Sequence, residues 1–187
     1  MKKILIITVI LGLSLATFAQ ENHANHTVPV ADSTAKKPKS PRMSAMAIVG
    51  DNHVHLDYGS PSVRGRNVWG GLVAYNEVWC TGAHKATSIS FSKDIIINGI
   101  KISQGKYGLF TIQGEKESTF IINKMWDMHL ADNYNGKEDI VRIKVQNQKT
   151  DKLIETLTFE VKDLKNGMSQ VSMLWENRLL SFEVKNQ

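Results

Sequence analysis

Cysteine is almost absent from this chain of 187 residues, which contains only Cys80. A single cysteine excludes both a disulfide framework and the cysteine-rich zinc modules that stabilise many small domains. Hydrophobic residues make up 42% of the chain and charged residues 22%, which is typical of a globular protein rather than a disordered or fibrous one. The length is sufficient for one ordinary domain and short for two.

A basic surface is also missing from most of the chain, although the formal net charge is +5. Residues 1–45 carry six basic and two acidic side chains, whereas residues 46–187 balance 17 basic against 16 acidic ones. A nucleic-acid-binding protein needs lysine and arginine clustered on a folded face. We therefore expect no nucleic-acid partner.

The first nineteen residues have the layout of a secretory signal peptide. Two lysines precede an apolar run over residues 4–15, and the small residues Thr17 and Ala19 follow it. The run is shorter than the roughly 20 apolar residues that span a membrane. We expect cleavage after Ala19 and a soluble mature protein, without a transmembrane segment, in the periplasm or outside the cell.

The next segment, residues 20–45, is rich in turn-forming and polar residues. It contains Pro29, Pro38 and Pro41 among scattered serine, threonine and lysine. This composition predicts a flexible leader. The folded domain is then expected to occupy residues 46–187.

From residue 46 onward, apolar residues recur with a period of two, the pattern of a strand with one face on a core and the other in water. The clearest segments are 54–58, 89–91, 141–145, 157–161, 171–175 and 180–184. No stretch of ten residues favours a helix, and residues 125–135 have room for one short helical turn. The sequence predicts an all-β domain of eight or nine antiparallel strands, either a β-sandwich or a small barrel.

Three dipeptides predict turns between strands. Asn98-Gly99 and Asn166-Gly167 accept the positive φ angles of a two-residue hairpin turn. Glu176-Asn177 separates the last two alternating segments, and we expect the final hairpin to turn there.

Residues 59–87 interrupt the alternation. This segment contains five glycines and two tryptophans, and a connection of that length inside a compact domain is either functional or contains short elements of its own. Two interpretations remain open: a loop that folds over one end of the sandwich and plugs it, or a binding site.

The same region resembles a known bacterial family. The words DYGSPSVRGRNVWGGLVAYNEVWCTGAHKAT over residues 57–87 and INGIKISQGKYGLFTI over residues 97–112 are similar to the family called domain of unknown function 2911. The resemblance, which extends from about residue 46 to the C-terminus, implies an exported, mostly β domain with no established activity, and it provides no catalytic residues to carry over. Cys80 and His84 depart from the common pattern of the family, and His53 and His55 are not hallmarks of it.

Several residues of this region are candidates for binding a small ligand. Arginine offers a planar fork that suits carboxylate or phosphate, and tryptophan and tyrosine offer flat faces for stacking. Core packing is the alternative role for the aromatic rings. The candidates, some of them shared with the family pattern, are Tyr58, Arg64, Arg66, Trp69, Trp79 and Thr81.

A second set of residues could bind a transition metal. His53 and His55 are two apart on a predicted strand, so both imidazoles project from one face, and this arrangement suits copper or zinc. Further ligands could come from Cys80, His84 or His129. The alternative is that the histidines lie on a solvated strand face and that Cys80 is a small buried hydrophobe.

Enzymatic activity has less support. The chain lacks a G-x-S-x-G elbow, an H-E-x-x-H helix, a phosphate loop and a dinucleotide fingerprint. Cys80 and His84 could form a nucleophile and base pair, although no third orienting group is identified. The sequence therefore predicts a non-catalytic binding protein for an unknown small ligand or for copper or zinc. The alternative is a hydrolase-like envelope enzyme that uses the 59–87 loop, and the oligomeric state is not predicted.

Overall fold

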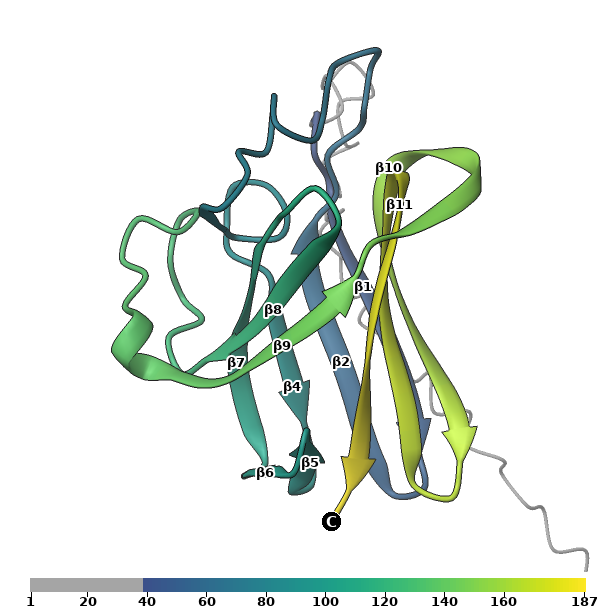
Figure 1. Ribbon diagram of the computed structural model, residues 1–187. Helices are drawn as coiled ribbons and strands as arrows, with labels where there is room; N and C mark the ends of the chain where they lie inside the picture. The colour runs from purple at the N-terminus through teal and green to yellow at the C-terminus, as the bar shows by residue number, and fades with distance from the viewer. Residues whose placement is uncertain (1–38) are drawn as a thin grey trace, which may run out of the picture. The chain divides into compact units, whose positions relative to one another are not determined.

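The computed structural model describes residues 39–187. The predicted signal peptide and residues 20–38 of the predicted leader lie outside this range. The described residues form two antiparallel sheets (Figure 1). This arrangement confirms the predicted all-β sandwich, and the sheets are not closed into a barrel.

The larger sheet has seven strands in the order β1-β2-β4-β7-β8-β9, with the short β3 paired to β7. Consecutive strands along this path are antiparallel. The strands are β1 (Arg42–Val49), β2 (Asn52–Gly59), β3 (Val78–Trp79), β4 (Ser88–Phe91), β7 (Gly105–Ile112), β8 (Glu117–Asn123) and β9 (Asp139–Gln146).

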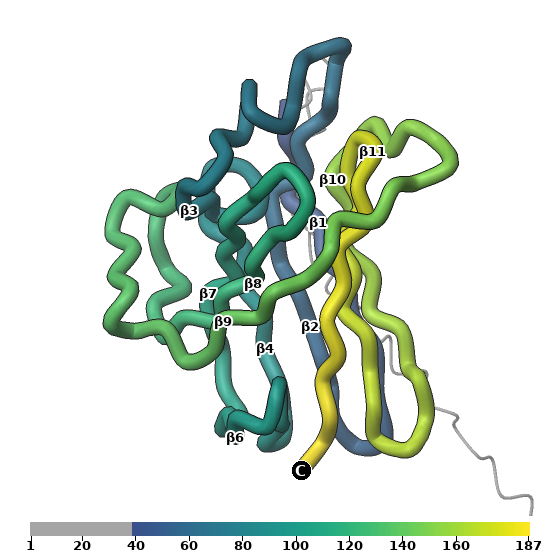
Figure 2. The backbone as a smooth tube through the Cα atoms, in the orientation of Figure 1, coloured from purple at the N-terminus to yellow at the C-terminus, as the bar shows by residue number. Residues whose placement is uncertain are grey.

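The smaller sheet has four strands in the order β10-β11-β5-β6. The long hairpin of β10 (Gln148–Lys165) and β11 (Met168–Asn186) dominates it, as Figure 2 shows, and the short strands β5 (Ile95–Ile97) and β6 (Ile100–Ile102) complete it. The 3-10 helix η1 (Gly136–Glu138) is the only helix among residues 39–187. It is far too short and polar to cross a membrane.

The main core lies between the two sheets, where the alternating residues of both meet. Tyr58 of β2 joins the sheets directly, because its ring packs edge-on against Phe159 of β10 at 4.9 Å and its hydroxyl accepts a hydrogen bond from the Phe159 amide. The fully buried residues of this core include Val54, Leu56, Ile89, Leu109, Phe120, Ile122, Leu157, Val171, Met173, Trp175, Leu180 and Val184.

Two of the three predicted turns are confirmed. The Asn98-Gly99 turn joins β5 to β6, and the Asn166-Gly167 turn joins β10 to β11. All four turn residues have positive φ angles between 48° and 78°. Asparagine and glycine tolerate that conformation better than other residues do.

The turn predicted at Glu176-Asn177 is wrong. β11 continues through both residues, and Glu176, with φ of 56°, pairs with Ile154 at a register shift between β10 and β11. A positive φ angle can reverse a chain, but at this position it produces a bulge. The strand continues because buried residues before and after the bulge, from Met173 to Leu180, pack into the core. One long bent strand therefore replaces two predicted short ones.

The N-terminal boundary also differs from the expectation. β1 begins at Arg42 and pairs with β2, so the last four residues of the predicted leader belong to the sheet. The prediction missed this strand because its inward residues include the small Ala45 and Ala47, whereas Met46 and Ile48 face outward and are 60% and 71% exposed. The helical turn expected within 125–135 is absent, and η1 follows that segment.

Candidate functional site

The 59–87 loop folds onto the edges of both sheets. At its start, residues 61–63 pair with β10: the Val63 amide donates to the Glu155 carbonyl and the Leu157 amide to the Pro61 carbonyl, at 2.8 and 2.9 Å. Near its end, β3 pairs with β7. Both attachments depend on backbone hydrogen bonds, which is why an irregular, glycine-rich sequence holds a defined position here.

Three tryptophans form a cluster beneath this loop. Trp79 stacks on Trp175 with centroids 5.6 Å apart, and Trp69 meets both rings edge-on at 6.3 and 5.6 Å. The Arg178 guanidinium lies 4.6 Å from the Trp69 ring and donates to the Tyr75 hydroxyl at 2.9 Å. This arrangement fits one of the two interpretations of the sequence, a loop that plugs one end of the sandwich, and its aromatic rings extend the main core.

The final part of the loop covers the outer face of the larger sheet. Ala86 donates to the Met128 carbonyl, and Leu130 donates to the His84 carbonyl at 2.6 Å, so residues 80–87 and 128–131 are tied together. Beneath them lies a second, smaller apolar cluster formed by Cys80, Ala86, Phe110, Ile121 and Met128.

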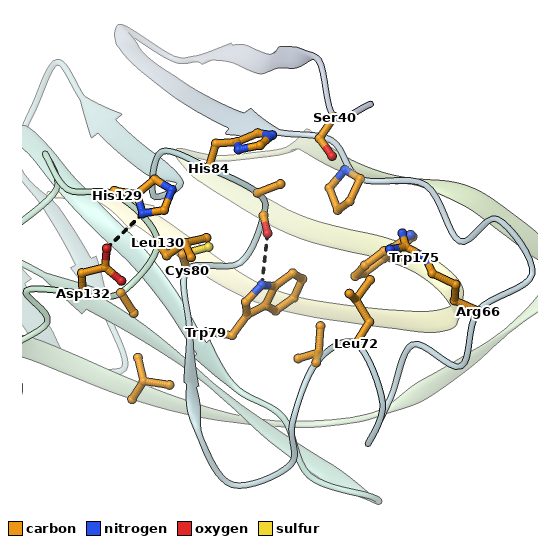
Figure 3. Close-up of a pocket in the computed structure, with 16 residues that line it drawn as sticks. Ser40, Arg66, Leu72, Trp79, Cys80, His84, His129, Leu130, Asp132 and Trp175 are labelled. Atoms are coloured by element: carbon orange, nitrogen blue, oxygen red, sulfur yellow. Dashed lines mark hydrogen bonds and ion pairs between the residues drawn. The ribbon is translucent and has the colours of Figure 1, made fainter. Parts of the chain in front are cut away.

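A pocket of about 650 Å³ opens between the aromatic cluster and these two tied segments (Figure 3). Its walls come from the 59–87 loop, from the 129–132 segment and from β11. The residues that line it are Ser40, Pro61, Arg66, Leu72, Val73, Val78, Trp79, Cys80, Gly82, Ala83, His84, His129, Leu130, Ala131, Asp132 and Trp175.

The pocket has an apolar wall and a polar rim. Leu72, Trp79 and Trp175 supply the apolar wall, and the Trp79 indole N–H is held by the Gly82 carbonyl at 3.1 Å. On the other side, His129 Nδ1 lies 2.9 Å from Asp132 Oδ2. Figure 3 shows this pair and His84 on the side of Cys80, away from Leu72.

Arg66 lies at the mouth of the pocket in a restrained position. Its guanidinium donates to the Val63 and Ser62 carbonyls at 3.1 and 2.6 Å. These neutral partners leave the positive charge of Arg66 uncompensated. An anionic ligand group could therefore interact with it.

Cys80 is buried in the wall of the pocket, with 1% of its surface exposed. The pKa of its thiol is raised to about 11, mainly by burial; among the smaller effects, a backbone hydrogen bond at Gly82 lowers the pKa and the nearby Asp132 carboxylate raises it. At pH 7 about one thiol in ten thousand would be ionised. Cys80 is therefore a neutral wall residue rather than an activated nucleophile.

One buried donor in this wall has no partner. Trp175 is fully buried, and its indole N–H makes no hydrogen bond within the described residues. A buried unpaired N–H costs about 1–3 kcal/mol. Polar groups of this kind are rare in folded proteins, and here one belongs to a residue that lines the pocket.

Two of the six predicted ligand-binding residues, Arg66 and Trp79, line the pocket. The other four lie elsewhere. Tyr58 and Trp69 are buried in the main core. Arg64 is exposed and donates to the Lys39 carbonyl at 2.8 Å. Thr81 is fully buried and pairs with Thr111.

The four predicted metal ligands are split between two places. Cys80 and His84 line the pocket, whereas His53 and His55 project from the outer face of β2, with ring centroids 5.9 Å apart. Among residues 39–187, no group of three or more His, Cys, Asp or Glu side chains is arranged to hold a metal ion. The structure does not assemble the predicted four-residue set.

The sequence left several pocket residues unassigned. Trp175 was recognisable only as a core residue of an alternating strand, and Leu72 carried no signal. For His129 the sequence predicts only a role as a further metal ligand. It reaches the pocket because its segment pairs with the loop, through a bridge between Lys85 and His129, and local sequence patterns do not reveal such a contact.

The comparisons with known proteins agree with this structure at the level of the family. The model of the family described as "Protein of unknown function (DUF2911)" matches residues 40–184. No curated protein and no solved structure matches the chain. The family match includes all eleven strands except the last residues of β11, so it covers the fold and the pocket together. The chain belongs to this family of unknown function.

Proposed function

We propose that the protein is an exported, non-catalytic binding protein and that its pocket holds a small ligand with a flat apolar body and an acidic group. The observation that carries this proposal is the pocket itself. Its volume of about 650 Å³ falls within the range of roughly 300–1,000 Å³ that is usual for small-molecule sites.

The wall chemistry supports this ligand class. Trp79 and Leu72 offer a broad apolar surface for a ring system, and Trp79 is held on β3, which pairs with β7. Arg66 and His84 on the rim are hydrogen-bond donors. A carboxylate or sulfonate is the group that donors of this kind bind best.

Binding without catalysis is favoured over the hydrolase-like alternative. The pocket does contain Cys80 and His84, the pair proposed for that alternative. However, burial raises the pKa of the Cys80 thiol to about 11, so the thiolate that would act as the nucleophile is scarce at neutral pH.

The test uses 8-anilinonaphthalene sulfonate, a dye with a flat apolar body and one sulfonate. We expect saturable binding of one dye per protein, measured by dye fluorescence and by calorimetry. Ala131→Trp, which places a large ring inside the pocket, should weaken binding at least about tenfold because it removes the space for the ligand. Arg66→Gln should weaken it several-fold, because the cation is lost.

The matched control is Leu153→Trp, since Leu153 is 61% exposed and lies outside the pocket. It adds the same ring to the surface and should leave dye binding unchanged. Equal binding by the Ala131→Trp and Leu153→Trp proteins would overturn the proposed site. If the site is confirmed, displacement of the dye by a panel of aromatic carboxylates would rank these compounds by their affinity for the pocket.

Export is supported by the sequence pattern of residues 1–19 alone. We expect the mature protein in the producing cell to begin at Gln20, because the small residues Thr17 and Ala19 precede that position. Intact-mass measurement of the protein from fractionated cells checks this. A mature protein that retains residues 1–19 and is found in the cytoplasm would refute export.

A further inference from the structure

A cluster of one methionine and two histidines lies on the outer face of the β1–β2 hairpin, away from the pocket walls. Met46 on β1 is the direct cross-strand partner of His55 on β2, and His53 is two residues from His55 on the same face. The Met46 sulfur lies 3.3 Å from His53 Nε2. The His53 and His55 rings lie nearly parallel, with centroids 5.9 Å apart.

These spacings match those of ligands that share one ion. Donor atoms bound to one ion at about 2.0–2.3 Å lie roughly 3.3–3.8 Å apart, and two imidazoles bound to that ion at tetrahedral or trigonal angles have centroids about 5.1–5.5 Å apart. The sulfur–nitrogen distance of the cluster, 3.3 Å, falls within its range, and the ring centroids, at 5.9 Å, are only a few tenths of an ångström too far apart. Side-chain rotation alone can therefore complete the site, because the antiparallel register already places the three residues together.

The donors select the kind of ion. One thioether and two imidazoles are soft and intermediate ligands, a combination that favours Cu(I) over zinc or calcium. The carboxylate on the same face of β2, Asp57, is occupied by two hydrogen bonds from Arg42. Lys106, which reaches the same row of the sheet through β4, directs its ammonium to the Trp126 ring at 4.2 Å.

Solvent exposure supports a binding role for Met46. It is 60% exposed, although methionine gains stability mainly by filling apolar space. An exposed sulfur in contact with an exposed imidazole is open to exchange of an ion with the solvent. It is also open to transfer of an ion from another protein.

We propose that Met46, His53 and His55 form a surface site for one Cu(I) ion. The site is separate from the pocket and does not depend on the proposed small ligand. Compared with the metal site predicted from the sequence, this site keeps His53 and His55 and has Met46 in place of Cys80 and His84. The predicted metal was copper or zinc, and the proposed metal is reduced copper.

Competition with bicinchoninate under anaerobic, reducing conditions tests the proposal. The purified full chain should withdraw one equivalent of Cu(I) more from the chelator than each of three variants does. These variants are Met46→Leu, His53→Gln and His55→Gln. We expect Met46→Leu to lower the affinity for Cu(I) at least about tenfold. All three residues lie on the surface, so these variants are expected to remain folded.

Two matched controls separate the site from background binding. Met43→Leu changes an exposed methionine on the opposite face of the same strand, and His129→Gln changes an exposed histidine at the pocket. Both should bind Cu(I) as the unchanged protein does. His23 and His26 are present in every variant, so any binding by these two residues adds the same background throughout.

Ag(I) provides a direct structural readout, because it has the charge and softness of Cu(I) without its redox chemistry. One equivalent should shift the Met46 methyl signal in the methionine NMR spectrum and leave the Met43 signal in place. Equal Cu(I) binding by the Met46→Leu and Met43→Leu proteins, or an unshifted Met46 methyl signal, would overturn the proposal. Tighter binding of Zn(II) than of Cu(I) at these residues would do so as well.

Discussion

At the scale of single residues, the fold changes the chemistry of Cys80 most clearly. Burial raises the pKa of its thiol from 9.0 to about 11. Below pH 9 the thiol is protonated in both the folded and the unfolded chain, so it has no effect on stability. Between pH 9 and pH 11 the unfolded chain loses this proton first, and the folded state is disfavoured.

We therefore predict that the free energy of unfolding falls above pH 9 by up to about 1.4 kcal/mol per pH unit from this group. Urea unfolding at intervals between pH 9 and pH 11 measures the slope. Cys80→Ala should remove this contribution, although it lowers stability equally at every pH by leaving a small cavity. Identical slopes in the two proteins would show that Cys80 does not titrate as described.

Tyr58 is expected to have a structural role. Its hydroxyl accepts a hydrogen bond from the Phe159 amide inside the core, and Tyr58→Phe leaves that buried donor unpaired. We predict a loss of about 1–3 kcal/mol in the free energy of unfolding, with dye binding at the pocket unchanged. If Tyr58→Phe weakened dye binding without changing the stability, Tyr58 would instead be a ligand-binding residue.

The residue types pointed to only part of the site. Arg66 and Trp79 were predicted from their chemistry, and both line the pocket. Trp69 has the same chemistry and belongs to the core, where the Arg178 guanidinium lies over its ring. Exposure decides between the two roles of an aromatic residue, and exposure depends on segments distant in the sequence.

At the scale of elements, glycine sets how closely the two ends of the 59–87 loop can approach. A Cβ on Gly59 would clash with the Ala83 carbonyl, and Ala83 is part of the pocket wall. We predict that Gly59→Ala costs about 1–3 kcal/mol of stability and also weakens dye binding. Chemical denaturation and the dye titration measure both effects.

Gly136→Ala is the control for this substitution. Its added Cβ would meet nothing closer than 3.6 Å, so stability should change by less than about 0.5 kcal/mol. If the Gly59→Ala protein were as stable as the Gly136→Ala protein, the close approach of Gly59 to Ala83 would not contribute to the fold.

Strand patterns predicted the elements well where one face is apolar. The turns at Asn98-Gly99 and Asn166-Gly167 followed from local chemistry, because only a few residues accept two consecutive positive φ angles. The bulge at Glu176 shows the limit of such signals. A reversal and a bend can begin with the same backbone angle, and tertiary packing selects between them.

At the scale of the whole molecule, β11 contributes to the smaller sheet, to the main core and to the pocket. It pairs with β10 and β5, and it brings Trp175 to the pocket. Its last ten residues carry Leu180, Phe182 and Val184 into the main core. The pocket therefore depends on segments more than a hundred residues apart, which is why local patterns could not predict it.

We predict that removing residues 178–187 prevents folding. Three buried apolar side chains are lost, at about 2–5 kcal/mol each, and their sum approaches or exceeds the total stability of a typical domain. The amide spectrum and the near-ultraviolet circular dichroism of the truncated chain should be those of an unfolded protein. Removal of the exposed Gln187 alone is the control and should leave both unchanged. Cooperative unfolding of the longer truncation would contradict the prediction.

The tryptophan cluster has an optical consequence. Trp79 and Trp175 are stacked at 5.6 Å with planes only 22° apart, and Trp69 stands nearly perpendicular to both. Transition dipoles held this close in a chiral arrangement couple, so the strong ultraviolet band of the indoles should split into a positive and a negative lobe of circular dichroism. Because Trp79 and Trp175 form part of the pocket wall, the sign and amplitude of this couplet should report occupancy without any added label.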